Sequence, residues 1–259
     1  MDFQKFFFGF FQIIKFDFEQ FVIIFNSISP VFLWIIFLFF CFFSILMFLK
    51  LFGEVGIYVY TVIAIITANI QLLKIVKFSF FNDPIPLGTA LFASTFLCTD
   101  ILVEHYGEKK ARKNILIGFV GFLIFNFYIL FTLGFSPADF ETQNKLKDIF
   151  LPLPIFFAAS MVAYLISQFF DVWFFIKISI FTKKKYLWFR NNLSTIVSSL
   201  LDNIIFSIFA WIIFNPNPEN IKTVIGFIFG TYILRILISF LDTPFVYLAK
   251  YIIYNNQNE

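Results

Sequence analysis

The chain has 259 residues, of which 60% are hydrophobic and 14% are charged. A soluble domain carries roughly 25% charged residues, so this chain lacks the polar surface of a water-soluble globule and we expect it to lie in a lipid bilayer. The net charge of +3 gives no reason to expect nucleic acid as a partner, and two cysteines with one histidine are too few for a disulfide framework, a metal site or a haem site. We expect no cofactor.

The first stretch, residues 1–29, differs from the rest of the chain. Its polar side chains fall close to one helical face and Phe and Ile fill the remainder: Gln4, Lys5, Gln12, Lys15 and Glu19. This periodicity is typical of a helix that lies in the membrane interface. A basic start and a cleavage site of small residues are missing, so a signal peptide is not expected.

Seven later stretches are long and apolar enough to cross the hydrocarbon core, which takes about 20 residues of helix. They are residues 30–49, 55–76, 85–106, 114–135, 151–176, 193–214 and 223–253. The connections between them are short. We therefore predict an all-α integral membrane protein, with one compact bundle of about seven transmembrane helices over residues 30–253 and a short tail at 254–259.

Lys and Arg cluster in two of the connections. The links after the third and fifth stretches carry most of them: Lys109, Lys110, Arg112, Lys113, Lys177, Lys183, Lys184, Lys185 and Arg190. Connections rich in Lys and Arg stay in the cytoplasm. With seven crossings, the N-terminus would lie outside and the C-terminus in the cytoplasm of a multi-pass protein.

Ionisable residues within a membrane span are costly, so each is a candidate for function. Asp202 lies about ten residues into its span, and Ser198 shares its face. The alternative for Asp202 is a hydrogen bond that joins two helices, and its depth of roughly 15 Å favours function. Asp171 follows Ser167 and Gln168 on a polar stripe of an otherwise apolar helix.

Two further polar positions have equally balanced interpretations. Asn69 is a lone amide at depth, suited either to a hydrogen bond between helices or to a ligand contact. Arg235 and Asp242 stand seven residues apart on one face of the last span, so they form either an internal charge pair or part of a site. Pro244 should bend that helix just beyond.

The stretch "LCTDILVEHYGEKKARKN" places two carboxylates, Asp100 and Glu104, on one face of a helix. Tyr106-Gly107 is typical of a helix end, with Gly supplying the left-handed cap. Glu104 suits either a salt bridge to the basic link or a ligand contact, whereas Asp100 is a turn deeper. Carboxylates outnumber cations in the spans, and an unpaired buried carboxylate takes up a proton or awaits a cationic partner.

The segment "TDILVEHYGEKKARKNILIGF" resembles the signature of the queuosine-precursor transporters, also called the vitamin-uptake transporter family. Three more stretches resemble family helices in the same order: "GIYVYTVIAIITANIQLLKIV", "VAYLISQFFDVWFF" and "LWFRNNLSTIVSSLLDNIIFSIFAW". The similarity covers about residues 55 to 250, which is most of the chain.

This resemblance implies an inner-membrane importer of a queuosine precursor, 7-cyano-7-deazaguanine or 7-aminomethyl-7-deazaguanine, for tRNA modification. It implies six core helices preceded by one additional helix. By position it implies these substrate-binding residues: Asn69, Asp100, Glu104, Gln168, Asp171, Arg190, Asn191, Ser194 and Asp202. The chain departs from the family at Ser199, Asn203 and Arg235, where we expect Gln, Thr and Lys, and this puts the exact ligand in doubt.

We expect a central cavity shared by Asp100, Asp202, Asp171 and Asn69, with Glu104 and the basic link closing its cytoplasmic end. Carboxylates accept paired N–H groups from a guanine-like edge, while amides and Arg serve its acceptors. Aromatic side chains can stack on the ring, and the two candidates are Trp173 and Phe206.

A carrier of another small vitamin-like molecule stays open as an alternative, and so do two functions of other classes. One is the substrate-binding subunit of an ATP-energised vitamin uptake complex, which would dock a partner, or a second copy of the chain, through small residues: Ala64, Ala68, Gly226 and Gly230. The other is a membrane enzyme that uses Asp100 and Glu104 as an acid–base pair. The expected partners remain a small deazapurine and the lipid bilayer, without nucleic acid, and we expect no enzyme.

Overall fold

The computed structural model describes residues 2–79, 85–151, 153–215 and 217–256, and these residues are mostly helical. The elements in chain order are α1 (Asp2–Ile14), α2 (Phe18–Asn26), α3 (Pro30–Gln71), β1 (Ile75–Val76), β2 (Ile85–Pro86), α4 (Thr89–Tyr106), α5 (Glu108–Gly134), α6 (Phe140–Phe150), α7 (Leu153–Phe181), α8 (Leu187–Ile208), the π-helix η1 (Phe209–Ile213) and α9 (Ile221–Asn256). β1 and β2 form one short antiparallel pair. The last residues of the predicted tail, 257–259, lie outside this description.

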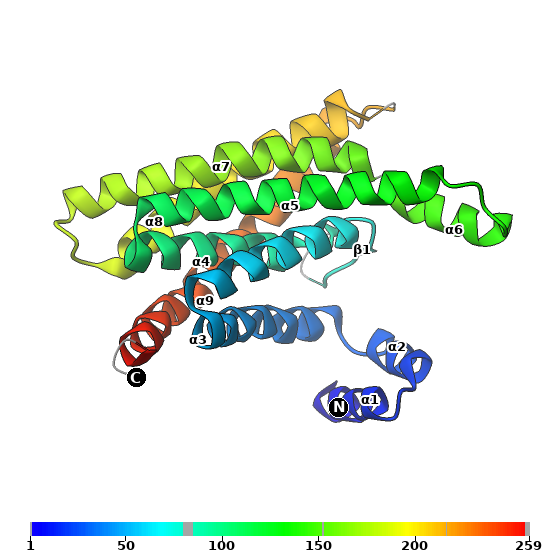
Figure 1. Ribbon diagram of the computed structural model, residues 1–259, viewed down its shortest axis with the longest axis horizontal. Coiled ribbons are helices and arrows are strands. Elements are labelled where there is room, and N and C mark those ends of the chain that lie inside the picture. Colours follow the sequence, from blue (N-terminus) through cyan, green and yellow to red (C-terminus); the bar gives the residue numbers. More distant parts are fainter. Residues whose placement is uncertain (1, 80–84, 152, 216, 257–259) are drawn as a thin grey trace.

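The long helices form one bundle (Figure 1). Five helices of the described chain are long and apolar enough to cross a membrane: Pro30–Gln71, Glu108–Gly134, Ala158–Phe181, Leu187–Ile213 and Ile221–Tyr254. α4 is shorter and more polar, and it packs inside the bundle against α3, α5, α7, α8 and α9. The protein is therefore an all-α membrane bundle.

The bundle exposes apolar side chains and buries polar ones. Phe127 and Phe131 on α5 are more than half exposed, whereas Asp100 on α4 and Asp171 on α7 are fully buried. Lipid is the natural environment of such a surface, and the polar side chains inside must find partners within the protein.

A sharp reversal divides α3 into two limbs. Gly53 has φ 59° and ψ −140°, which is outside the helical region. Only Gly adopts such a conformation readily. At Gly56 a side chain would meet the Phe48 carbonyl, since a Cβ built there lies 2.1 Å from that oxygen. The two limbs run side by side in opposite directions, in the positions of the first two predicted spans.

The bundle has two ends, which we name after the features found there (Figure 1). The Gly53 end carries the reversal in α3, the junction of α4 with α5, the connection between α7 and α8, and the end of α9. The hairpin end carries β1 and β2, α6 and η1. These two ends provide the frame for the site.

The connections at the Gly53 end are shorter than predicted. α4 ends at Tyr106, as predicted, but Gly107 has φ 87° and ψ 165°, so it lies outside the left-handed helical conformation that we expected of the cap. Because Gly107 alone reverses the chain, α5 begins at Glu108 rather than at residue 114. α8 likewise begins at Leu187 rather than at residue 193, so Arg190 belongs to a helix and not to a loop.

The N-terminal stretch forms two helices at the hairpin end. α1 and α2 pack on each other, with Gly9 against the ring of Phe25. The side chain of Lys5 donates to the Ser27 carbonyl across 3.1 Å. Phe7 and Phe8 are more than half exposed, so this helix pair presents an apolar surface.

Candidate functional site

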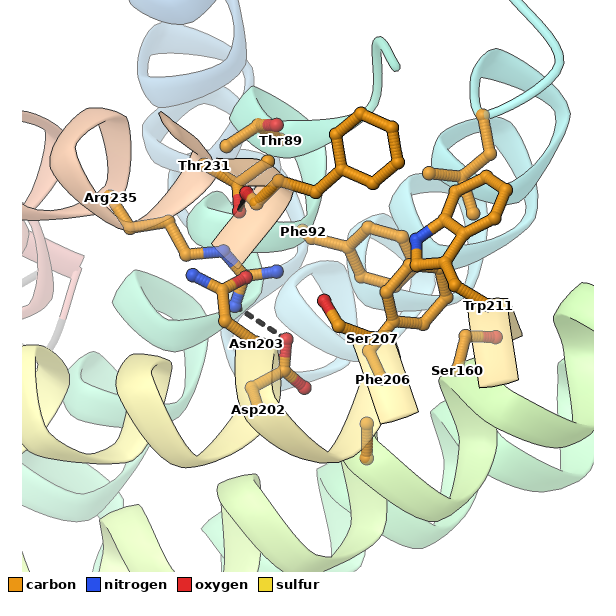
Figure 2. A pocket seen from close by; sticks show the side chains of 13 residues that line it. Thr89, Phe92, Ser160, Asp202, Asn203, Phe206, Ser207, Trp211, Thr231 and Arg235 are labelled. Carbon is orange, nitrogen blue, oxygen red and sulfur yellow. Dashed lines mark hydrogen bonds and ion pairs between the residues drawn. The ribbon is translucent and has the colours of Figure 1, made fainter. Parts of the chain in front are cut away.

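A small cavity of about 40 Å³ lies toward the hairpin end, between the start of α4 and parts of α7, α8, η1 and α9 (Figure 2). Thirteen side chains line it: Leu72, Thr89, Phe92, Ser160, Ala163, Asp202, Asn203, Phe206, Ser207, Trp211, Phe227, Thr231 and Arg235. Figure 2 shows Arg235, Asn203 and Asp202 on one side of the space and the aromatic rings of Phe206 and Trp211 on the other. The cavity thus combines a polar wall with an aromatic wall.

An ion pair dominates the polar wall. The Nη1 atom of Arg235 lies 2.5 Å from Oδ2 of Asp202, and both side chains are nearly buried. Ser167 Oγ donates to the other oxygen, Asp202 Oδ1, across 3.0 Å. Arg235 Nε and Asn203 Nδ2 are buried donors without a hydrogen-bond partner. A ligand with acceptor atoms would therefore find two donors ready to bind it.

This pair corrects one sequence interpretation. Arg235 pairs with Asp202 of α8, whereas Asp242 accepts a hydrogen bond from Asn191 Nδ2 across 3.0 Å. The two α9 residues do not pair with each other, because a seven-residue separation corresponds to roughly 10 Å along a helix.

The aromatic wall depends on the π-helix η1. Phe214 N–H donates to the Phe209 carbonyl across 2.8 Å, five residues back. This wider turn follows directly on α8 and carries Trp211, whose ring packs against Phe227 with centroids 5.4 Å apart. Such π-turns occur frequently at functional sites. Phe206 also lines the cavity, but the other predicted stacking residue, Trp173, is 47% exposed on the outside of α7.

α7 and α8 exchange Ser–Asp hydrogen bonds. Ser167 of α7 donates to Asp202 of α8 across 3.0 Å, and Ser198 of α8 donates to Asp171 of α7 across 2.7 Å. On each helix the Ser and the Asp are four residues apart and so share a face. The exchange joins the cavity to a second group of polar residues nearer the Gly53 end.

We name this second group the acid centre; it consists of Asp100, Asp171 and Asp242 with Asn191. All four residues are 0% exposed. One face of α8 brings the three carboxyls together: Asn191 donates to Asp242, Thr195 donates to Asp100 and Ser198 donates to Asp171. Thr195 Oγ1 donates to Asp100 across 3.1 Å.

Ser194 lies beside the acid centre. Its hydroxyl donates to the Asn191 carbonyl across 3.2 Å, and its own carbonyl accepts from Ser198 Oγ across 2.7 Å.

Two predicted amides serve as links between helices. Gln168 accepts a bond from Thr99 Oγ1 at 2.7 Å and donates to Thr95 Oγ1 at 2.9 Å. Asn69 accepts from Ser160 Oγ at 2.8 Å and donates to the Ile65 carbonyl. Ser160 lines the cavity, so Asn69 lies directly behind the wall.

A second ion pair lies at the Gly53 end. Arg190 Nη2 is 2.5 Å from Glu104 Oε1, and the Arg190 side chain is 2% exposed. Glu104 therefore makes a salt bridge, as one interpretation expected, but with the arginine of α8. Two of the cations at the start of α5 pair elsewhere, Lys110 with Glu54 and Arg112 with Glu108.

Of the nine predicted site residues, Asp202 lines the cavity directly, Asn69 stands behind its wall, and the others lie closer to the Gly53 end. We expected Asp100, Asp171 and Asp202 to share one cavity. In the structure Asp202 lines the cavity, whereas Asp171 lies one turn away along α7 and α8, together with Asp100. The prediction of binding residues did not include Asn203, Trp211, Thr231 and Arg235. For Arg235 its charge within a span was a usable signal; Trp211 was one aromatic among many.

The fold and this cavity define a multi-pass helical membrane protein with a polar site enclosed by its bundle. Residues 86–249 match the family described as "Putative vitamin uptake transporter". The chain is also 34% identical, over 226 residues, to the "Probable queuosine precursor transporter" of Bacillus subtilis (strain 168), covering 86% of this chain and 96% of that protein. The chain belongs to this vitamin uptake transporter family, whose members are transporters and not enzymes. No solved structure matches it.

Proposed function

We propose that this protein is a carrier that imports a queuosine precursor, 7-cyano- or 7-aminomethyl-7-deazaguanine, across the cell inner membrane. The similarity to a protein named as such a transporter supports the cargo. The observation that carries the proposal is the cavity itself, in which an Asp–Arg pair faces Phe206 and Trp211. A deazaguanine has the matching parts, because its edge carries paired N–H donors and its ring has a flat face.

The proposed contacts follow from the chemistry of the wall. Asp202 accepts the paired N–H groups of the guanine-like edge, and Arg235 Nε and Asn203 Nδ2 donate to its acceptors. Trp211 and Phe206 stack on the ring. Since Arg235 pairs with Asp202, substrate binding and the ion pair compete for the carboxylate.

The proposed arrangement in the membrane has seven crossings: the two limbs of α3, then α4, α5, α7, α8 with η1, and α9. The Gly53 end faces the cytoplasm, because it carries the Lys-rich start of α5 and the Lys-rich connection after α7. The C-terminus then lies in the cytoplasm. Residues 1–29 form an interfacial segment, residues 30–253 the transport domain and residues 254–259 a tail.

In this orientation the cavity lies in the outer half of the bundle. The acid centre and the Glu104–Arg190 pair close the inner half. A drug-sized ligand takes roughly 300 Å³ or more, so the cavity of about 40 Å³ must widen when substrate binds. We propose that the inner half opens afterwards and that substrate then passes the remaining predicted residues: Asp100, Glu104, Gln168, Asp171, Arg190, Asn191 and Ser194.

Two of the small residues that were predicted to dock a partner are buried inside the bundle. Ala64 and Ala68 are fully buried within the chain, and the Ala68 carbonyl lies 2.7 Å from a Cβ built on Gly88. The small residues of the second limb therefore pack the bundle itself and offer no docking face. A dimer or an energising partner would need another surface.

A rescue assay tests the proposal. The chain is expressed in cells that neither make nor import the precursor, either deazaguanine is supplied, and queuosine is scored in tRNA. We expect rescue by the wild type and by Asp148→Asn, an exposed control on α6, and loss of rescue in Asp202→Asn at equal membrane level. Absence of rescue with both compounds contradicts the cargo or reveals a missing partner, and co-purifying ATPase subunits would then favour the energised complex.

A further inference from the structure

The acid centre contains more hydrogen-bond acceptors than donors. Among the described residues, four of its buried oxygens have no hydrogen-bond partner: Asp100 Oδ1, Asp171 Oδ2, Asp242 Oδ2 and Asn191 Oδ1. Each belongs to a side chain that is 0% exposed. A buried acceptor without a donor is costly, and ionised carboxylates can only accept. Protons on the carboxyls themselves would supply such donors.

Among the described residues, no ion pair joins a cation to Asp100, Asp171 or Asp242. The two buried arginines nearby are already paired, Arg190 with Glu104 and Arg235 with Asp202. The thiol of Cys98, two residues before Asp100 on α4, is also buried. Within the described chain, no three carboxylate, thiol or imidazole groups converge closely enough to hold a metal ion.

Two protons would satisfy all four oxygens. Asp100 and Asp171 are held by Thr195 and Ser198, three residues apart on one face of α8, so one shared proton would serve Asp100 Oδ1 and Asp171 Oδ2. Two adjacent buried carboxylates repel each other, so such a pair keeps one proton between them. Asn191 already donates to Asp242 Oδ1 across 3.0 Å. A proton on Asp242 Oδ2 would donate back to Asn191 Oδ1 and close a paired acid–amide ring.

The centre is connected to the cavity. Asp171 is bound by Ser198 of α8, and Asp202 is bound by Ser167 of α7. Because the Ser and the Asp are four residues apart on each helix, Asp171 and Asp202 lie one helical turn apart, about 6 Å along the helix axis. A ligand that displaces Arg235 from Asp202 therefore acts on the same two helices, α7 and α8, that hold Asp171.

We propose that Asp100, Asp171, Asp242 and Asn191 form a two-proton centre, and that its loading and unloading couples transport to the proton gradient. The coupling rests on the proposed function, because it needs the cavity to be the cargo site. The protons themselves do not depend on what the cargo is.

Reconstituted liposomes test the coupling with the full chain and labelled deazaguanine. The membrane potential is held at zero and the outside is made one pH unit more acidic than the inside. We expect about tenfold accumulation for each coupled proton, since one pH unit corresponds to a tenfold ratio. Asp242→Asn should lose this accumulation and keep substrate counterflow, because an Asn–Asn pair preserves the ring without a titrating group. Asp148→Asn is the matched control.

Equal accumulation with and without the gradient would overturn the coupling, as would a gradient response in Asp242→Asn. Accumulation driven by sodium at constant pH would overturn it too. These outcomes require counterflow of deazaguanine in the wild type, and its absence would count against the cargo.

Infrared spectroscopy of the purified protein tests the protons without any cargo. At neutral pH we expect carbonyl bands of protonated carboxylic acids that shift in heavy water. One band should disappear in Asp242→Asn and another in Asp171→Asn, whereas Asp148→Asn should keep both. If the wild type shows no such band, the centre is ionised and the proposal is wrong. If the bands are present but the protein binds neither deazaguanine, the proposed protons are supported and the proposed cargo is wrong.

Discussion

The cavity and the acid centre lie one helical turn apart on the same helices, but the carboxylate in the cavity has a cationic partner and those in the acid centre do not. In the cavity, Asp202 meets Arg235 and the two charges cancel. In the acid centre, three carboxylates meet only neutral donors such as Thr195, Ser198 and Asn191. A cancelled pair can exchange one partner for a ligand, whereas a group of like charges requires protons. One bundle therefore provides a place for a flat polar cargo and, beside it, a place for protons.

The largest effect should come from breaking the charge pair of the cavity. Arg235→Ala leaves Asp202 buried without its cation, so we expect a loss of about 3–5 kcal/mol in the free energy of unfolding and loss of uptake. Arg235→Lys keeps the charge and should retain part of both. Unfolding is followed in detergent. The control is Arg112→Ala, whose exposed pair with Glu108 contributes about 1 kcal/mol or less. Equal stability of the two alanine variants would contradict the role of the pair.

A smaller effect should come from the aromatic wall. Trp211→Ala removes the stacking surface, and we expect substrate to bind about 1–3 kcal/mol more weakly, as base–aromatic stacking contributes. The matched control is Trp173→Ala, on the outer face of α7, which should leave affinity unchanged. Binding is measured by titration of the purified protein. Similar losses in both variants would place the stacking surface elsewhere.

The crossed Ser–Asp bonds sharpen the comparison further. Ser167→Ala and Ser198→Ala each remove one hydrogen bond, worth about 0.5–1.5 kcal/mol. We expect Ser167→Ala to lower substrate affinity and Ser198→Ala to change the pH profile of transport with little effect on affinity. Both variants are assayed for binding and for uptake across a pH series. Identical behaviour would mean that the cavity and the acid centre are not separable.

The smallest expected effect concerns Asp139, a carboxylate that is exposed to solvent at the start of α6. Asp139 caps α6: its side chain accepts from the Thr142 hydroxyl and from the backbone N–H groups of Glu141 and Thr142, and these bonds lower its pKa. A lowered pKa contributes stability above the ordinary value of about 4, which is lost as the pH falls through the folded value.

Hydrogen exchange measures this cap. The protection factors of the first turn of α6, which correct for the intrinsic exchange rate at each pH, should fall as the medium becomes more acidic than about pH 4. Asp139→Ala should show fast exchange already at neutral pH, with uptake unchanged. Slow exchange in the variant would mean that Asp139 does not hold the helix end.

Features that are local in the chain were predictable from sequence. The apolar lengths identified the long helices, Gly107 marked the end of α4, and the depth of Asp202 selected a residue that lines the cavity. Pairing between distant helices was not predictable, because nothing near Arg235 in the chain indicates Asp202 rather than Asp242 as its partner. Trp211 could not be selected either, since the π-turn that places it leaves no pattern in a chain rich in aromatic residues.

The reversal at Gly53 has a consequence for how the chain is made. Its two limbs are joined without an intervening polar loop, so they would enter the bilayer as a preformed hairpin and not one after the other. In the proposed orientation, the segment ahead of that hairpin must then be carried across to the outside. It holds two lysines, Lys5 and Lys15, against three acids, Asp2, Asp17 and Glu19. A segment with so few positive charges meets little resistance to translocation, so the biogenesis of the protein is compatible with its proposed topology.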